Sequence, residues 1–231
     1  MEFKLVADLL NIAGAKTSYT IDRLEEVPFP YDDYDLLKEE DGKWAYGVFR
    51  QYMKNQPYLE KKKIFDTKEE GSQFFFLERL SSHYSLTVVH PLLARQELQI
   101  YDATFDIPKL RHALSVAGAS QDLFYVDEEP DHRAIVLETK EEDYSIAFYG
   151  ERGEKIFSHI PGSIIVHADA TAEEIEKKFA EAPPLELREA LFFVFQKVVK
   201  LHLFETEVLA LLKGGNVNVT FTDKDVERFI S

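Results

Sequence analysis

The longest run of apolar positions in the chain extends from Pro184 to Lys213 and has the spacing of a helix. A proline in the first turn and two glycines after the last lysine are typical of helix ends. Residues 191–195 are apolar on every side of such a helix, so we expect other elements to surround that turn in the core. The pattern fits one long helix or two helices broken near residues 202–206. The alternation over residues 199–203 also fits a short strand.

Helical spacing also dominates the first third of the chain. Residues 2–13 and 44–53 each place apolar side chains near one helical face, and a capping-box pattern precedes a third helix over residues 68–80. The proline-rich and acidic stretch over residues 27–42 predicts an irregular, solvated connection. We therefore predict a mostly helical N-terminal subregion over residues 1–80.

After residue 82 the apolar spacing changes to that of short strands. Runs rich in β-branched and aromatic residues, separated by turn or charged residues, lie at 84–90, 97–101, 122–127, 133–138, 144–150 and 163–167. The polar connections over residues 138–143 and 150–155 are short, which favours antiparallel hairpins. Two more helices are predicted among the strands, at residues 107–116 and 172–181.

These elements together predict the α+β class. We expect a mixed, mainly antiparallel sheet packed by the long C-terminal helix. The organisation that we predict is a single α+β domain over residues 1–231, with residues 82–231 as its sheet-containing body.

Two segments of the body resemble each other. LQIYDATFDIPKLRHAL at residues 98–114 and IIVHADATAEEIEKKFA at residues 164–180 share an apolar run, an Asp-Ala-Thr turn and apolar positions four apart. A duplicated strand-turn-helix unit would explain the similarity. Because aspartate and threonine are common helix caps, chance explains it equally well.

Negative charge is concentrated in two stretches of a chain whose formal net charge is -15. Residues 1–42 hold 11 acidic against 4 basic residues, and residues 127–143 hold 8 against 2. A field of this sign repels phosphate backbones and anionic lipids, so it argues against nucleic-acid and membrane partners, and it attracts a basic or amphipathic protein. The chain has no cysteine and no apolar leader near its start, so we expect a cytoplasmic protein.

Catalytic and cofactor motifs are scarce. The sequence has no nucleophile elbow of the G-x-S-x-G type and no glycine-rich dinucleotide fingerprint, so we predict no catalytic residue and no cofactor. His167 and Asp169 stand two apart near a predicted strand end, and His159 is a third candidate ligand for a divalent metal ion. The competing interpretation is that Asp169 or Thr171 caps the helix that follows.

By elimination, the sequence favours a non-enzymatic protein that binds another polypeptide. Immunity proteins and secretion chaperones are the classes that fit a small acidic binder. The expected contact residues are acidic and aromatic, because tyrosine anchors interfaces and carboxylates pair with basic partners. They are Tyr31, Asp32, Asp33, Tyr34, Asp35, Asp127, Glu128, Glu129 and Asp131. The alternatives are a metal-dependent hydrolase that uses His167, Asp169 and His159, and a DNA-mimicking inhibitor.

Overall fold

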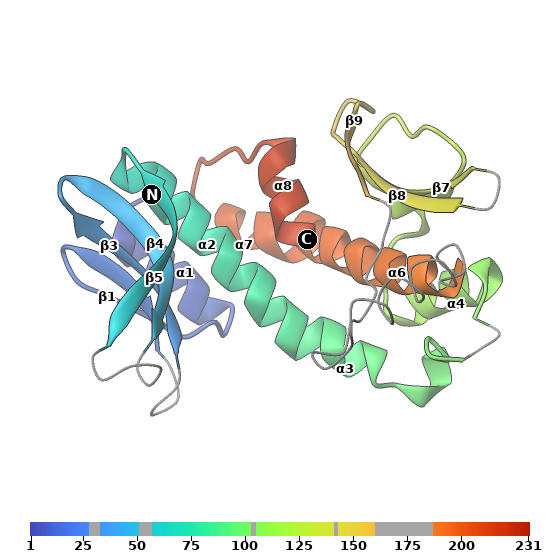
Figure 1. The fold of residues 1–231 in the computed structure, drawn as a ribbon, viewed down its shortest axis with the longest axis horizontal. Helices are drawn as coiled ribbons and strands as arrows, with labels where there is room; N and C mark the ends of the chain where they lie inside the picture. Colours follow the sequence, from blue (N-terminus) through green and yellow to red (C-terminus); the bar gives the residue numbers. More distant parts are fainter. Residues whose placement is uncertain (28–32, 51–56, 103–104, 141–142, 160–186) are drawn as a thin grey trace, which may run out of the picture. The chain divides into compact units, whose positions relative to one another are not determined.

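A computed structural model describes residues 1–27, 33–50, 57–102, 105–140, 143–159 and 187–231. These residues form helices and two separate β-sheets, so the α+β class is confirmed (Figure 1). No helix in the described part of the chain is both long enough and apolar enough to cross a membrane.

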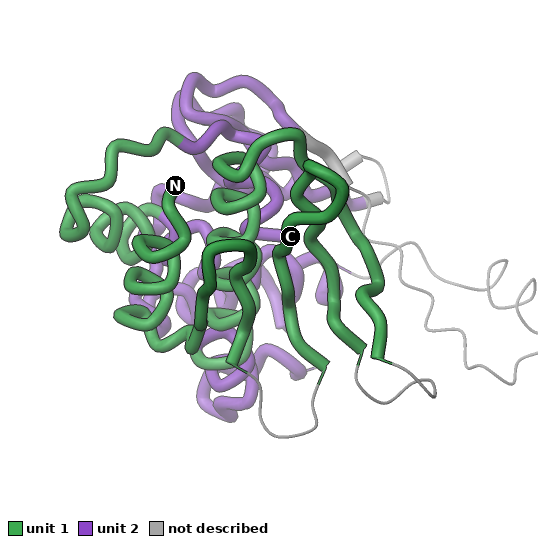
Figure 2. The backbone as a smooth tube through the Cα atoms, turned by 90° about the vertical axis from the view of Figure 1, so that its left-hand side faces the viewer, with its two compact units in different colours: residues 1–87, 205–220 green, residues 88–204, 221–231 purple. Residues whose placement is uncertain are grey.

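The chain divides into two compact units (Figure 2). The first unit contains residues 1–87 and 205–220, and the second contains residues 88–204 and 221–231. The single α+β domain over residues 1–231 stays a prediction.

The first unit contains a five-stranded antiparallel meander in the order β1-β2-β3-β4-β5. Its strands are β1 (Thr17–Tyr19), β2 (Arg23–Glu26), β3 (Tyr34–Glu40), β4 (Lys43–Arg50) and β5 (Tyr58–Phe65). Asp41 and Gly42 join β3 to β4 with φ angles of 53° and 76°. A two-residue Asp-Gly turn with positive φ at both positions matches the right-handed twist of the flanking strands.

Helices α1 (Phe3–Ile12) and α2 (Lys68–Tyr84) pack on this meander (Figure 1). The strand side chains that face them come from alternate positions, because neighbouring residues of a strand point to opposite faces. Leu24 pairs with Leu37, which pairs with Tyr46, and none of the three is more than 2% exposed. The Tyr46 ring meets the Phe74 ring of α2 edge to face at 5.0 Å.

The predicted mostly helical subregion over residues 1–80 is therefore wrong between its first and last helices. Residues 44–53 begin with β4, and residues 27–42 contain β3. The spacing of the apolar residues over 44–53 did not distinguish a helix from a strand, because positions four apart share a face in both. The predicted helices over residues 2–13 and 68–80 are confirmed as α1 and α2.

The predicted strand over residues 84–90 is also wrong. Helix α2 continues through a π-helical turn, η1 (Ser85–Val89), into the short helix α3 (His90–Leu93). The hydroxyls of Ser85 and Thr87 donate to the backbone carbonyls of Ser81 and His83, both at 2.8 Å. Such bonds to the preceding turn let serine and threonine stay in a helical backbone despite their other preferences.

The predicted strand over residues 97–101 is replaced by a 3-10 turn, η2 (Gln96–Leu98), followed by Gln99 with a φ of 52°. The described residues of the first similar segment, residues 98–114 without 103–104, therefore contain a helix but no strand. Its helix is α4 (Ile107–Val116), which confirms the prediction for residues 107–116. The second segment, residues 164–180, lies outside the described residues, as do the predicted elements at 163–167 and 172–181.

The second unit contains a four-stranded sheet in the order β6-β7-β8-β9. Its strands are β6 (Phe124–Val126), β7 (Ala134–Lys140), β8 (Asp143–Tyr149) and β9 (Lys155–His159). β6 runs parallel to β7, after the 3-10 turn η3 (Gln121–Leu123), and the other pairs are antiparallel. The predicted strands over residues 122–127, 133–138 and 144–150 and both predicted hairpins are confirmed.

The long C-terminal helix is confirmed as a continuous helical segment. It comprises α6 (Leu187–Leu203), the π-helical turn η4 (Phe204–Val208) and α7 (Leu209–Gly214). The break expected near residues 202–206 is thus a widened turn, and the alternative of a strand over residues 199–203 is wrong. In the second unit α6 packs against β7, β8 and α4, and Leu191, Val194 and Phe195 are 0% exposed, as expected for the turn that is apolar on all sides.

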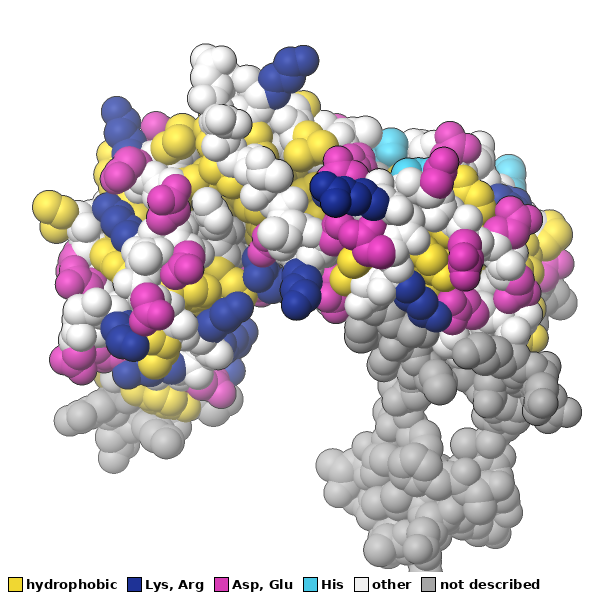
Figure 3. Space-filling model, turned by 90° about the horizontal axis from the view of Figure 1, so that it is seen from above, with side chains coloured by type: hydrophobic (Ala, Val, Ile, Leu, Met, Phe, Trp, Pro, Cys, Tyr) yellow, Lys and Arg dark blue, Asp and Glu magenta, His cyan; other side chains and the backbone are white. Residues whose placement is uncertain are grey.

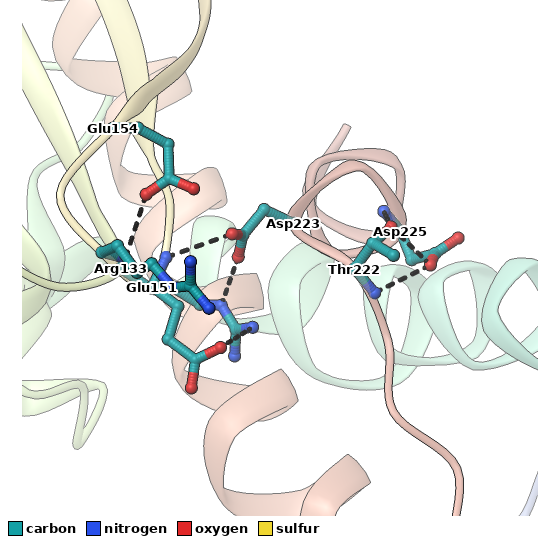
Figure 4. A network of polar contacts seen from close by, with 7 residues as sticks. Arg133, Glu151, Glu154, Thr222, Asp223 and Asp225 are labelled. Atoms are coloured by element: carbon teal, nitrogen blue, oxygen red, sulfur yellow. Dashed lines mark hydrogen bonds and ion pairs between the residues drawn. The ribbon is translucent and has the colours of Figure 1, made fainter.

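The last helix, α8 (Asp223–Ile230), is fixed to the sheet of the second unit by its first residue (Figure 4). Asp223 accepts a bond from Arg133 Nε at 2.7 Å and one from the backbone N–H of Glu151 at 3.3 Å. Gly150 makes room for this contact, because a Cβ there would lie 2.6 Å from the Asp223 carboxylate. Thr222 and Asp225 complete a capping box at the same helix end.

Lys197 gives a test of the packing around α6. Burial lowers the pKa of its amine, and the charge of Glu227 only partly opposes this effect. Because the folded state binds this proton more weakly than the unfolded state, the ammonium destabilises the fold at neutral pH. We expect Lys197→Met to raise the free energy of unfolding by about 1 kcal/mol, or roughly 2–4 °C in Tm.

Thermal unfolding at pH 7 measures this effect, with Lys224→Met on the exposed side of α8 as the matched control. The control should change stability by less than about 0.5 kcal/mol. The advantage of Lys197→Met should shrink as the pH rises towards 10, where the unfolded amine also loses its proton. A destabilised Lys197→Met protein would contradict the prediction.

Candidate binding pocket

The first acidic stretch is held inside the first unit. Tyr31 and Asp32 lie outside the described residues, and Asp33, Tyr34 and Asp35 lie at the start of β3. Asp33 forms an ion pair with Arg50 at 2.9 Å. The ring of Tyr34 packs against Phe49 with 5.1 Å between centroids, and burial is the main cause that raises the Tyr34 pKa.

Asp35 belongs to a buried polar network between the sheet and α2. Its Oδ1 accepts a hydrogen bond from the Tyr46 hydroxyl at 2.9 Å, and its Oδ2 lies 3.4 Å from Arg79 Nη1. Arg79 Nη2 lies 2.8 Å from Glu26 Oε1, and the Arg79 side chain is only 9% exposed. Burial first, and then the charge of Asp35, raises the Tyr46 pKa. The solvated connection predicted for residues 27–42 is therefore wrong at Asp35, because this carboxylate neutralises a buried guanidinium.

Asp35→Asn tests this structural role. The substitution leaves the Arg79 charge with less compensation in a buried site, so we expect the free energy of unfolding to fall by about 1–3 kcal/mol. Glu39→Gln is the matched control, because Glu39 lies on the same strand and is exposed, and its loss should cost less than about 0.5 kcal/mol. Urea denaturation measures both. Equal effects would show that the network contributes nothing particular to stability.

The second acidic stretch borders a cavity. A cavity of about 200 Å³ in the second unit is lined by Asp127, Glu128, Glu129, Val136, Glu138, Thr139 and Tyr149. Three of the four contact residues that the sequence predicts in this stretch lie in its wall, and Asp131 does not. The structure thus brings Asp127, Glu128 and Glu129 together with a fourth carboxylate, Glu138.

The floor of the pocket is apolar because of the register between β7 and β8. Val136 pairs with Ala147, and Ala134 pairs with Tyr149, so these residues share one face of the sheet. Val136, Ala147 and Tyr149 are 1%, 0% and 5% exposed and form a small core cluster with Tyr125. The pocket therefore combines buried apolar groups below with carboxylates around them.

Asp127 shapes the pocket wall through backbone geometry. Its φ is 53°, and its N–H donates to the carbonyl of Leu137 at 3.0 Å. Its carboxylate accepts a bond from the Thr139 N–H at 2.6 Å and another from the Thr139 hydroxyl. These bonds lower the Asp127 pKa, so the group stays anionic at neutral pH and ties the end of β6 to β7.

Glu138 already binds a cation of the chain itself. Lys155 Nζ lies 2.5 Å from Glu138 Oε1 and 2.7 Å from Oε2, and the Ser145 hydroxyl donates to Oε2 at 3.0 Å. The Glu138 side chain is 15% exposed. One wall of the pocket is thus a carboxylate whose geometry suits an ammonium group.

Glu128 and Glu129 differ from the other two carboxylates. Both are exposed, and neither forms an ion pair or hydrogen bond with another residue in the described part of the chain. Figure 3 shows acidic side chains scattered over the surface among basic, hydrophobic and other side chains. The two glutamates are therefore charges that an external cation can reach without displacing an internal partner.

Tyr149 places a phenol beside these charges. Burial raises its pKa, and the charges of Glu138 and Glu129 raise it further, so the hydroxyl keeps its proton at neutral pH. A phenol of this kind can donate to a carboxylate and accept from a cation at the same time. The wall of the pocket therefore offers a phenol and carboxylates as contacts for a positively charged group.

Asp131 has a local partner instead of a place in the pocket. Its Oδ1 lies 2.9 Å from His132 Nδ1, while His132 Nε2 lies 2.9 Å from the backbone carbonyl of Asp122. Both ring nitrogens face acceptors, which only the imidazolium form satisfies fully. The hydrogen bond to Asp131, followed by that to the Asp122 carbonyl, raises the His132 pKa.

We expect Asp131→Asn to lower the His132 pKa, measured by an NMR pH titration in which His132→Gln identifies the resonance. Because the folded pKa is raised, the imidazolium stabilises the fold fully below its ordinary value of 6.5. That stabilisation is lost as the pH rises through the folded pKa. The stability difference between the wild type and His132→Gln should therefore shrink with rising pH, and a constant difference would argue against the charged pair.

The alternative metal site is only partly described. His167 and Asp169 lie outside the described residues, and His159 is the last residue of β9. The described part of the chain contains no group of three or more histidine, aspartate or glutamate residues that could hold a metal ion. The hypothesis of a metal-dependent hydrolase stays untested.

Sequence reasoning missed Val136, Glu138, Thr139 and Tyr149 as pocket residues. The alternation that places Val136 and Glu138 on one face was visible in the predicted strand over residues 133–138. The proximity of these residues to Glu128 and Glu129 was not visible, because it depends on the pairing of β6, β7 and β8.

Comparisons with known proteins add no relatives. No protein-family model matches the chain, and searches of curated proteins and of solved structures find no match either.

Proposed function

We propose that this chain is a non-enzymatic acidic protein that binds a basic polypeptide through the pocket of its second unit. The observation that carries the proposal is the pocket itself, in which two carboxylates without a partner among the described residues, Glu128 and Glu129, lie beside an apolar floor. Carboxylates around apolar surface are complementary to a basic side chain, which has a hydrocarbon stem and a charged end.

The overall charge supports a basic partner. At a formal net charge of -15, long-range attraction speeds encounter with a basic protein and disfavours nucleic acids and anionic membranes. The described ion pairs of the first unit, such as those of Asp33 and Asp35, neutralise that unit's own cations. The unpaired glutamates of the second unit are therefore better placed to receive a partner. An immunity protein or a secretion chaperone remains the class that we propose for such a binder.

The size of the pocket favours a side chain of a polypeptide over a free cofactor. Sites for small organic ligands usually measure about 300–1,000 Å³. The cavity here is about 200 Å³, so it would hold one side chain of a partner whose remaining contacts lie outside it.

The double variant Glu128→Gln/Glu129→Gln tests the proposed site. The probe is a short peptide that alternates lysine with serine, and its affinity is measured by calorimetry at low and high salt. We expect the double variant to weaken binding about tenfold at low salt and to flatten the salt dependence, because both charges contribute to attraction.

The matched control is Glu97→Gln/Glu189→Gln, which removes the same charge from exposed positions of the second unit outside the pocket. It should change the affinity less than about twofold, within the usual effect of distant charges. Equal weakening by both double variants would mean that the peptide responds to net charge alone, and the proposed site would be rejected.

A further inference from the structure

Two π-helical turns lie where the chain passes between its two compact units. The first boundary, between Thr87 and Val88, falls inside η1, and the second, between Phe204 and Glu205, falls inside η4. These are the two π-helical turns among the residues that the structure describes. Such turns are rare in proteins and are found frequently at functional sites. Their coincidence with both boundaries indicates that the turns serve the connection between the units.

The sequence around η1 explains why the helix widens there. Residue 91 is a proline, which has no N–H, so the carbonyl of Thr87 cannot receive the ordinary α-helical bond from four residues later. The hydroxyls of Ser85 and Thr87 also donate to carbonyls of the preceding turn, and bonds of this kind bend a helix. The backbone of η1 therefore resists bending less than that of a regular α-helix.

The turn η4 is buried at both ends and exposed in the middle. The ring centroid of Phe204 lies 6.1 Å from that of Phe221 and 5.4 Å from that of Phe229, and all three residues belong to the second unit. Val208, four residues later, belongs to the first unit and is 0% exposed. Thr206 between them is exposed. The two ends of the turn are thus buried residues of different units, which confines bending of the helix to the few residues between them.

The third passage between the units has no regular structure that would oppose such bending. Its boundary lies between Thr220 and Phe221, and residues 217–222 form neither helix nor strand. Helix α8 begins only at Asp223, inside the second unit. Hinges in proteins are typically a few residues in loops or at the ends of elements, where the backbone angles can change. All three passages of this chain consist of backbone that is neither regular α-helix nor strand.

We propose that η1 and η4 form a paired hinge, which allows the two units to change their relative orientation while both helical segments stay continuous. A carbonyl in a π-helical turn accepts from the N–H five residues later, and in an α-helix from the N–H four residues later. In η4 a carbonyl can exchange one donor for the other, so the helix bends without leaving that carbonyl unpaired. The inference is independent of the proposed function, because it uses none of the pocket residues.

The first experiment measures distances between pairs of spin labels by pulsed electron paramagnetic resonance. The chain has no cysteine, so labels attach only to cysteines introduced at exposed positions. The pair Glu39→Cys and Glu97→Cys joins the two units, whereas Asp8→Cys and Glu39→Cys lie within the first unit. If the hinge bends, the distance distribution between the units should be at least about twofold wider than the one within the first unit.

Deletion of Glu207 tests η4 directly. Glu207 is exposed, and removing one residue from the turn favours α-helical bonds, so the distribution between the units should narrow by about half. Glu207→Ala keeps the residue count and is the matched control, with the wild-type width. In η1, Pro91→Ala restores the missing N–H and should also narrow the distribution. Pro108→Ala is its control, because a proline in the first turn of α4 blocks no helical hydrogen bond.

Amide hydrogen exchange of the unmodified chain keeps the hinge testable even if a variant does not fold. We expect the amides of η1 and η4 to exchange at least about tenfold faster than those in the middle of α2 and α6. Equal protection would show that the two turns are fixed kinks, and so would a distribution between the units as narrow as the one within the first unit. Either result would overturn the inference, as would a wild-type width in both folded variants, the Glu207 deletion and Pro91→Ala.

Discussion

The requirement that a carboxylate removed from water must be paired divides the acidic residues of this protein into two groups. Asp35 and Glu138, whose side chains are 13% and 15% exposed, are held by donors of the chain and stabilise its own structure. Glu128 and Glu129 are exposed, have no such donors among the residues that the structure describes, and lie at the edge of a buried apolar cluster. A surplus of acidic residues alone is a weak argument for binding, because most surface charges only keep a protein soluble. The pocket is therefore a candidate binding site because two of its carboxylates have no partner among the described residues, and not because the chain is acidic.

Strand β7 places the pocket and the core of the second unit on opposite faces of one sheet. Ile135 and Leu137 are both 0% exposed, and α6 packs against β7. The intervening positions, Val136 and Glu138, point to the other face and line the pocket. Because successive residues alternate so strictly, a shift of one residue in the β7 register would bury Glu138 and expose Leu137. Packing of α6 therefore also fixes the geometry of the pocket.

The fold was predictable where a pattern had one structural interpretation. The apolar turn over residues 191–195, the Thr67 cap ahead of α2 and the two hairpins of the second sheet had such patterns, and the structure confirms them. Prediction failed where local preference was ambiguous. Trp44 and Val48 share a face in a strand as well as in a helix. The β-branched residues around Thr87 lie in a π-helical turn, where the hydroxyls of Ser85 and Thr87 donate to backbone carbonyls of the preceding turn of α2.

The candidate site, too, was predictable from the sequence only in part. By itself the sequence determined the α+β class, the long helix around which the second unit packs, and the position of the second acidic stretch, because periodicity, capping and charge are local properties of a chain. Only the tertiary structure decided that Asp35 is buried with Arg79, whereas Glu128 and Glu129 stand beside Glu138 and Tyr149. Those relations depend on strand order and register, which bring together residues far apart in the sequence and decide which charges are paired.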